Sequence, residues 1–158
     1  MIKLLENMKK TIKFAMVLFV AFGIIACADN DNIGNEYLDV TFNNISGDWK
    51  MESYEGGITW ADGSYYYITF NRKDRTFVSY DNLDSMEAVR LTGRYDIVTN
   101  EASVIFGMYD YRGDWEHRYY VRDLTKDRMV WVAVDDESIV RVYVRAELPE
   151  WLPKEDEK

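Results

Sequence analysis

Hydrophobic and polar residues alternate along the chain between Val40 and Ala146, in short runs separated by turn-forming residues. A period of two is typical of β-strands that bury one face. Polar turns at 72–74, 99–101 and 135–137 divide the region, and no convincing amphipathic helix interrupts it. We expect eight strands, at residues 49–52, 64–71, 76–80, 91–98, 102–109, 115–121, 129–134 and 139–144. This pattern predicts an all-β antiparallel barrel, with a β-sandwich as the alternative, and excludes a parallel α/β fold.

The N-terminus has a different pattern, because three lysines there precede an unbroken apolar run from Phe14 to Ala26. The lysines are Lys9, Lys10 and Lys13. Basic, apolar and small residues in this order are typical of a secretory signal peptide. The run has thirteen residues, whereas a helix that spans a membrane needs about twenty. We therefore expect residues 1–26 to direct export and then to be removed.

Cys27 follows the apolar run directly and is the only cysteine of the chain. The segment Ile24-Ile25-Ala26-Cys27 resembles the lipobox of bacterial lipoproteins, in which the cysteine is lipidated before cleavage. The resemblance implies attachment of acyl chains such as palmitate, and two such chains give stable anchoring. A single cysteine has no disulfide partner within its own chain, so lipidation accounts for it. The alternatives are a signal peptide with an unrelated cysteine, or a buried free thiol.

Composition and charge narrow the class of protein further. A chain of 158 residues has room for one domain, and its 47% hydrophobic and 15% aromatic content indicates a folded core. The chain has 19 basic and 28 acidic residues, which gives a net charge of −9. Residues 1–26 contain four of the basic residues and one of the acidic ones, so removal of this segment changes the net charge to −12. We expect no binding of nucleic acid and no attachment to anionic lipid by charge alone.

Four segments follow from these observations. They are a signal peptide at 1–26, the lipidated cysteine with a polar tether at 27–39, a β-domain at 40–148, and a C-terminal tail at 149–158 that Trp151 attaches to the domain. Ala28 stands where some bacteria use aspartate to retain lipoproteins at the inner membrane. We therefore expect a monomer anchored through Cys27 in the outer membrane, either at its periplasmic face or at the cell surface.

The β-domain resembles a known family at three places. Gly47-Asp48-Trp49 is similar to the Gly-x-Trp signature of lipocalins, and the stretches 68–77 and 91–95 resemble small lipocalin-like lipoproteins of Gram-negative bacteria. The resemblance covers about residues 45 to 146 and implies an up-and-down barrel of eight strands that holds a small apolar ligand. It also implies that an arginine late in the chain packs across Trp49, and both Arg141 and Arg145 fit that description.

Candidate binding residues follow from the alternation of side chains. On the strand expected at 115–121, one face carries Trp115, His117 and Tyr119, which turns His117 toward the barrel interior. His117 then either contacts a ligand or is a neutral histidine bonded to a neighbouring tyrosine. Tyr66 and Tyr95 are the other residues that we expect to line the interior. Glycine at position 93 is expected to let its strand bend or pack closely.

Neither catalysis nor a cofactor is expected, because the chain has no nucleophile-elbow motif and only one histidine. Ligands for a metal would have to be mostly carboxylates. The first functional hypothesis is a lipid-anchored barrel that binds a small hydrophobic or glycan-like ligand. The second is a surface module for protein interaction or inhibition, whose barrel is filled by its own aromatic side chains. The volume of the interior distinguishes the two hypotheses.

Overall fold

The computed structural model describes residues 36–56, 61–83, 85 and 87–153. The expected signal peptide, Cys27 and the expected tether up to residue 35 lie outside this part. Within it, no helix is both long enough and apolar enough to cross a membrane.

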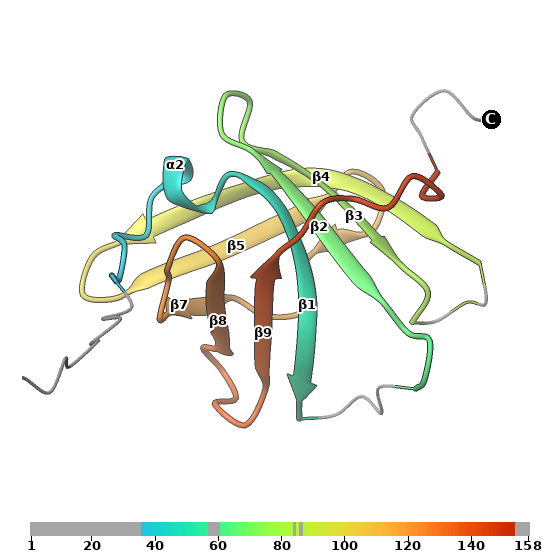
Figure 1. The fold of residues 1–158 in the computed structure, drawn as a ribbon. Coiled ribbons are helices and arrows are strands. Elements are labelled where there is room, and N and C mark those ends of the chain that lie inside the picture. Colours follow the sequence, from blue (N-terminus) through green and yellow to red (C-terminus); the bar gives the residue numbers. More distant parts are fainter. Residues whose placement is uncertain (1–35, 57–60, 84, 86, 154–158) are drawn as a thin grey trace, which may run out of the picture. The chain divides into compact units, whose positions relative to one another are not determined.

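Eight antiparallel strands close into a barrel (Figure 1). Each strand pairs with the next along the chain, the last pairs with the first, and the β4–β5 pairing completes the ring. Closure rules out the alternative of a sandwich with open edges. The barrel strands are β1 (Gly47–Glu55), β2 (Tyr66–Asn71), β3 (Thr76–Asp81), β4 (Val89–Thr99), β5 (Ser103–Tyr109), β7 (Tyr119–Arg122), β8 (Arg128–Ala133) and β9 (Val140–Arg145).

Two local features differ from the sequence prediction. A one-turn helix, α2 (Phe42–Ile45), precedes β1, and its N-cap Thr41 accepts a hydrogen bond from the Asn44 amide. The strand expected to begin at residue 115 begins only at 119, because the chain first forms the two-residue strand β6 (Gly113–Asp114) on the edge of β5 and then leaves that edge. Alternation alone could not detect this departure, since residues 115–118 keep the period of two.

The two ends of the barrel differ. At the end where β1 begins and β9 ends, α2 lies across the opening (Figure 1), and the interior is filled by large side chains with almost no exposure. They include Ile45, Trp49, Phe70, Leu124, Met129 and Trp131. We call this the closed end. The opposite end, where β1, β3 and β5 finish, carries no covering helix among the described residues.

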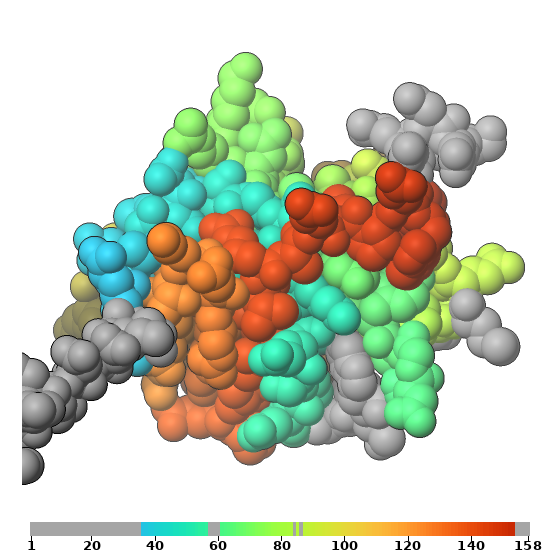
Figure 2. Space-filling view, viewed as in Figure 1, coloured from blue at the N-terminus to red at the C-terminus, as the bar shows by residue number. Residues whose placement is uncertain are grey.

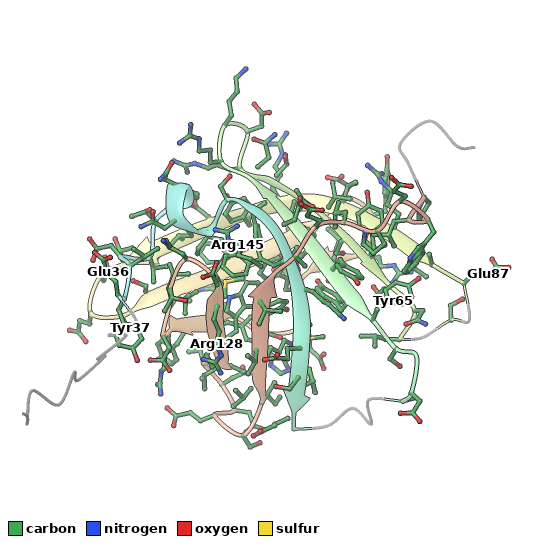
Figure 3. The ribbon with its side chains drawn as sticks, in the orientation of Figure 1. Glu36, Tyr37, Tyr65, Glu87, Arg128 and Arg145 are labelled. Atoms are coloured by element: carbon green, nitrogen blue, oxygen red, sulfur yellow. The ribbon has the colours of Figure 1, made fainter. Side chains whose placement is uncertain are left out.

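The closed end contains the Gly-x-Trp signature. Gly47 has a φ of 104°, and a Cβ there would lie 2.8 Å from the Arg145 guanidinium, so glycine is needed both for the conformation and for the close approach. The Arg145 guanidinium lies 3.7 Å from the Trp49 ring centroid and donates hydrogen bonds to the carbonyls of Ser46 (2.6 Å), Asn44 (2.8 Å) and Lys126 (3.0 Å). Figure 3 shows Arg145 at this end. Of the two arginines that fitted the signature, Arg145 therefore packs across Trp49.

The C-terminal segment packs on the outside of the barrel. Leu152 is 5% exposed and forms a small apolar cluster with Tyr67 and Tyr80, which face outward from β2 and β3. The Trp151 ring meets the Tyr65 ring edge-on with centroids 4.9 Å apart. In Figure 2 this red segment lies against the green strands. Trp151 thus contributes to the attachment as expected, although Leu152 is the more deeply buried anchor.

Candidate ligand-binding site

Two adjoining cavities, of about 280 and 290 Å³, occupy the open end of the barrel. Four residues line both cavities: Tyr66, Tyr109, Arg112 and Arg141. The first cavity adds aromatic side chains, chiefly Trp115, Tyr119 and Trp131. The second cavity adds aliphatic ones, chiefly Met51, Leu83, Val89 and Leu91. A small molecule in this space would therefore touch one aromatic wall and one aliphatic wall.

Arg141 lies between the two cavities because the final strand has an unusual arrangement. In β9, valines 140, 142 and 144 face outward, whereas Arg141 and Tyr143 face inward. The guanidinium carbon of Arg141 lies 4.8 Å from the Tyr119 ring centroid and 5.1 Å from that of Tyr54. A planar guanidinium stacks well on such rings. The tyrosines thus fix the position of a cation inside the open end.

Burial raises the pKa of the phenols around this cation. The pKa of Tyr143 rises to about 12, and those of Tyr66, Tyr109 and Tyr119 also rise, with burial as the largest cause in every case. These tyrosines are neutral near pH 7. Burial acts to lower the pKa of Arg141, but nearby phenol oxygens outweigh it, and the net shift is upward. Arg141 is therefore a cation among neutral side chains.

Two buried polar atoms on the cavity wall have no hydrogen-bond partner among the described residues. They are the Arg141 Nε atom and the Trp115 Nε1 atom. Buried donors are almost always satisfied in native proteins, by protein, water or ligand. Two N–H groups without a partner in the described part of the chain therefore lie in the walls of the open-end cavities.

Trp115 is placed in the cavity by a glycine on the facing strand. Its amide donates to the Gly107 carbonyl at 2.8 Å, and a Cβ on Gly107 would overlap the indole ring. The ring also packs on Trp131 and Phe77, with centroids 5.5 and 5.1 Å away. Gly93 is equally restricted, since a Cβ there would meet the Met108 carbonyl oxygen and the Phe77 ring. Close packing at Gly93 is therefore confirmed.

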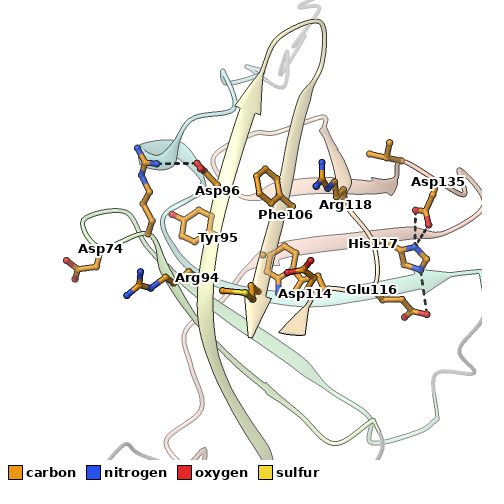
Figure 4. Close-up of a pocket in the computed structure, with 15 residues that line it drawn as sticks. Asp74, Arg94, Tyr95, Asp96, Phe106, Asp114, Glu116, His117, Arg118 and Asp135 are labelled. Carbon is orange, nitrogen blue, oxygen red and sulfur yellow. Dashed lines mark hydrogen bonds and ion pairs between the residues drawn. The ribbon is translucent and has the colours of Figure 1, made fainter. Parts of the chain in front are cut away.

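A larger recess of about 700 Å³ lies beside the segment 115–118 that leaves β5 (Figure 4). Most of the side chains that line it are exposed and carry charges of both signs, including Arg94, Asp114, Glu116, Arg118 and Asp135. A site for a small ligand normally encloses most of the molecule behind apolar walls. The recess is larger than the open-end cavities but is also more open, so it encloses less of a bound molecule.

His117 lies in this recess rather than in the two open-end cavities. Its Nδ1 atom is 2.9 Å from both carboxylate oxygens of Asp135, and its Nε2 atom is 3.9 Å from Glu116 (Figure 4). The hydrogen bond lowers the pKa of the Asp135 carboxyl group. The expectation that a tyrosine satisfies His117 is therefore wrong, because residues 115–118 turn away from the barrel wall before β7 begins. The Tyr119 ring touches the imidazole only edge-on, at 6.0 Å.

The structure brings only part of the expected set together. Trp115, Tyr119 and Tyr66 line the open-end cavities, whereas Tyr95 packs on Phe70 near the closed end, with centroids 4.7 Å apart. The expected set did not include Tyr54, Tyr109 or Arg112, and it included Arg141 only as a possible partner of Trp49. Tyr109 could have been found by alternation, since it shares a face of β5 with Ile105 and Gly107.

The described residues contain no group of three histidine, cysteine or carboxylate side chains that could hold a metal ion. His117 and Asp135 form a hydrogen-bonded pair in the outer recess. No serine, threonine or cysteine that such a pair could activate is among the described residues that line this recess.

Comparison with known families fits this geometry. A family model described as a lipocalin-like domain matches residues 45–131, which is more than half of the chain. The protein belongs to the lipocalin-like domain family. The matched part of this lipocalin-like protein runs from the end of α2 into β8, and β9, which carries Arg141 and Arg145, follows it and closes the barrel. None of the curated proteins or solved structures compared with the chain matches it.

Proposed function

We propose that this lipocalin-like protein is a lipid-anchored lipoprotein of the bacterial cell envelope that binds a small, largely apolar ligand in the open end of its barrel and has no catalytic activity. The observation that carries the proposal is the contrast between the ends, because one end is packed solid and the other retains two adjoining cavities. Aromatic and aliphatic walls with a few buried donors are typical of sites for small molecules.

The same contrast argues against a barrel filled by its own aromatic side chains. Such a barrel would serve only as a scaffold for surface contacts. Here the buried aromatic cluster leaves space at the open end, where its members Tyr66, Tyr119 and Trp131 line the cavities. Tyr66 faces inward and Tyr67 is covered by the C-terminal segment, so neither of them contributes to an outer binding patch. Tyr111, by contrast, is 97% exposed.

Small molecules that purify with the protein test the binding function. The protein is isolated from the envelope, denatured, and the released molecules are identified by untargeted mass spectrometry. We expect a molecule that is enriched over a Leu91→Trp variant, whose indole fills the aliphatic cavity. The matched control is Val98→Trp, on the outer face of the same strand, which should retain the molecule. Equal recovery from the wild type and Leu91→Trp would place any binding elsewhere.

Anchoring is tested separately by Cys27→Ser. The proposal rests here on the signal-like N-terminus and the position of the only cysteine. We expect the variant to leave the membrane fraction or to accumulate with its signal peptide uncleaved, and metabolic labelling with palmitate to be lost. Unchanged membrane attachment and normal processing would contradict the proposed anchor.

A further inference from the structure

The charge of Arg141 indicates what kind of ligand the barrel accepts, and this inference rests on the proposed function. Among the described residues, no carboxylate lies within ion-pair distance of Arg141, whereas Arg75 and Arg122 on the surface each have a carboxylate partner. The residues packed around its guanidinium are tyrosines, which are neutral near pH 7. A cation withdrawn from water is costly unless an anion or strong acceptors replace the water.

The packing on tyrosines does not satisfy all of the guanidinium. Arg141 is partly buried, its Nε atom has no solvent contact, and that atom has no hydrogen-bond partner among the described residues. The guanidinium lies against the rings of Tyr119 and Tyr54, and the phenol oxygens of Tyr54 and Tyr143 lie close to it. What remains of its edge matches the two oxygens of a carboxylate.

The walls on either side of Arg141 restrict the rest of the ligand. Met51, Val89 and Leu91 provide an aliphatic surface on one side, and Trp115 and Trp131 provide an aromatic one on the other. The second arginine of the cavities, Arg112, is exposed at their rim, so only one cation lies within. A single buried cation suits a ligand with one negative charge. A phosphate, with more charge and more acceptor oxygens, would leave most of these oxygens facing apolar side chains.

We propose that the ligand is a small organic acid whose carboxylate pairs with the Arg141 guanidinium and whose apolar body occupies the aliphatic or the aromatic side of the open end. The Trp115 indole N–H is the second donor available to the carboxylate or to a polar substituent near it. Of the acidic residues that line the same cavities, Asp114 and Glu116 lie at their exposed margin, and Asp81 is half-buried in the wall of the second cavity.

The test compares acids with uncharged amides of the same shape. Full-length protein in detergent is titrated calorimetrically at pH 7 with octanoate and octanamide, and with 2-naphthoate and 2-naphthamide, with titrations into empty micelles subtracted. We expect at least one acid to bind at least tenfold more tightly than its amide. The aliphatic and the aromatic pair then identify which side of the cavity holds the body.

Variants of Arg141 test the residue. Arg141→Met should weaken binding of the acid by about 10- to 100-fold, the effect of losing a charged hydrogen-bonded contact, and should leave binding of the amide within about twofold. Arg141→Lys should give an intermediate result, because it keeps the charge but loses the fork of donors. Arg122→Met, which removes a charge from the outer wall, should behave as the wild type. Circular dichroism verifies that each variant is folded.

The outcomes separate the two proposals. Equal affinity for acid and amide, or an Arg141→Met variant that keeps the preference for the acid, would overturn the organic-acid ligand and leave a binding barrel intact. If none of the four compounds binds to folded wild-type protein, both the ligand class and the binding function proposed above are contradicted.

Discussion

Replacement of Arg145 by methionine should destabilise the protein strongly. The side chain makes two partly buried hydrogen bonds, to the carbonyls of Ser46 and Asn44, and lies 3.7 Å from the Trp49 ring centroid. With about 1.5 kcal/mol for each charged hydrogen bond and about 1 kcal/mol for the ring contact, we expect the free energy of unfolding to fall by about 4 kcal/mol. The third bond, to Lys126, is exposed and adds little.

Urea denaturation followed by tryptophan fluorescence measures this loss, and Arg141→Met on the same strand is the control. Its guanidinium has no carboxylate partner among the described residues, and the cost of withdrawing this cation from water offsets its contacts with the Tyr54 and Tyr119 rings. Its removal should therefore change the free energy of unfolding by less than about 1 kcal/mol or should stabilise the fold. The denaturant slope should be the same in both variants. A loss below about 1 kcal/mol in Arg145→Met, or an equal loss in both, would refute the assignment of Arg145 to the signature.

Three further predictions concern the core and its titrations. Gly107→Ala should lower the thermal midpoint, with a loss of about 1–3 kcal/mol, because a Cβ there overlaps the Trp115 ring; an unchanged melting curve would contradict the placement of Trp115. Burial raises the pKa of Tyr95 and Tyr143 from 10.0 to about 12. Since the folded values exceed the unfolded one, this contribution to stability should be complete below pH 10 and lost as the pH rises through about 12. Phenolate absorbance should show a late-ionising group of tyrosines that includes these two together with Tyr66, Tyr109 and Tyr119. The hydrogen bond from His117 lowers the pKa of Asp135 below 3.8; its contribution to stability should be present above pH 3.8 and lost as the pH falls through the folded value. In carboxyl NMR titrations, His117→Gln should return the Asp135 midpoint toward 3.8, and an unmoved midpoint would count against the pair.

Much of the barrel could be predicted from the pattern of side chains. All eight expected strands are present, because each has one face in the core and the period of two follows from that. The departure at 115–118 could not be predicted, since these residues keep the alternation of a strand while leaving the neighbouring strand. One-turn helix α2 carries too few residues for any helical period to show.

The site was harder to predict than the fold. In β9 the apolar valines face outward and the inward positions hold Arg141, Tyr143 and Arg145, the reverse of what hydrophobicity suggests. Only the closed ring determines which face is inside. The Gly-x-Trp resemblance implied that one of two arginines would pack on Trp49, and the packing of Arg145 there leaves Arg141 available to the cavity.

The position of a bound ligand tests the central claim most directly. The full-length protein, labelled with ¹⁵N in perdeuterated form, is titrated with the acid that binds most tightly, and backbone amide shifts are mapped on the barrel. We predict the largest changes at Tyr66, Tyr109 and Arg141, with little change at Trp49 of the closed end or at Arg94 of the outer recess. Changes centred on Arg94 and its neighbours, with the open end unaffected, would contradict the account.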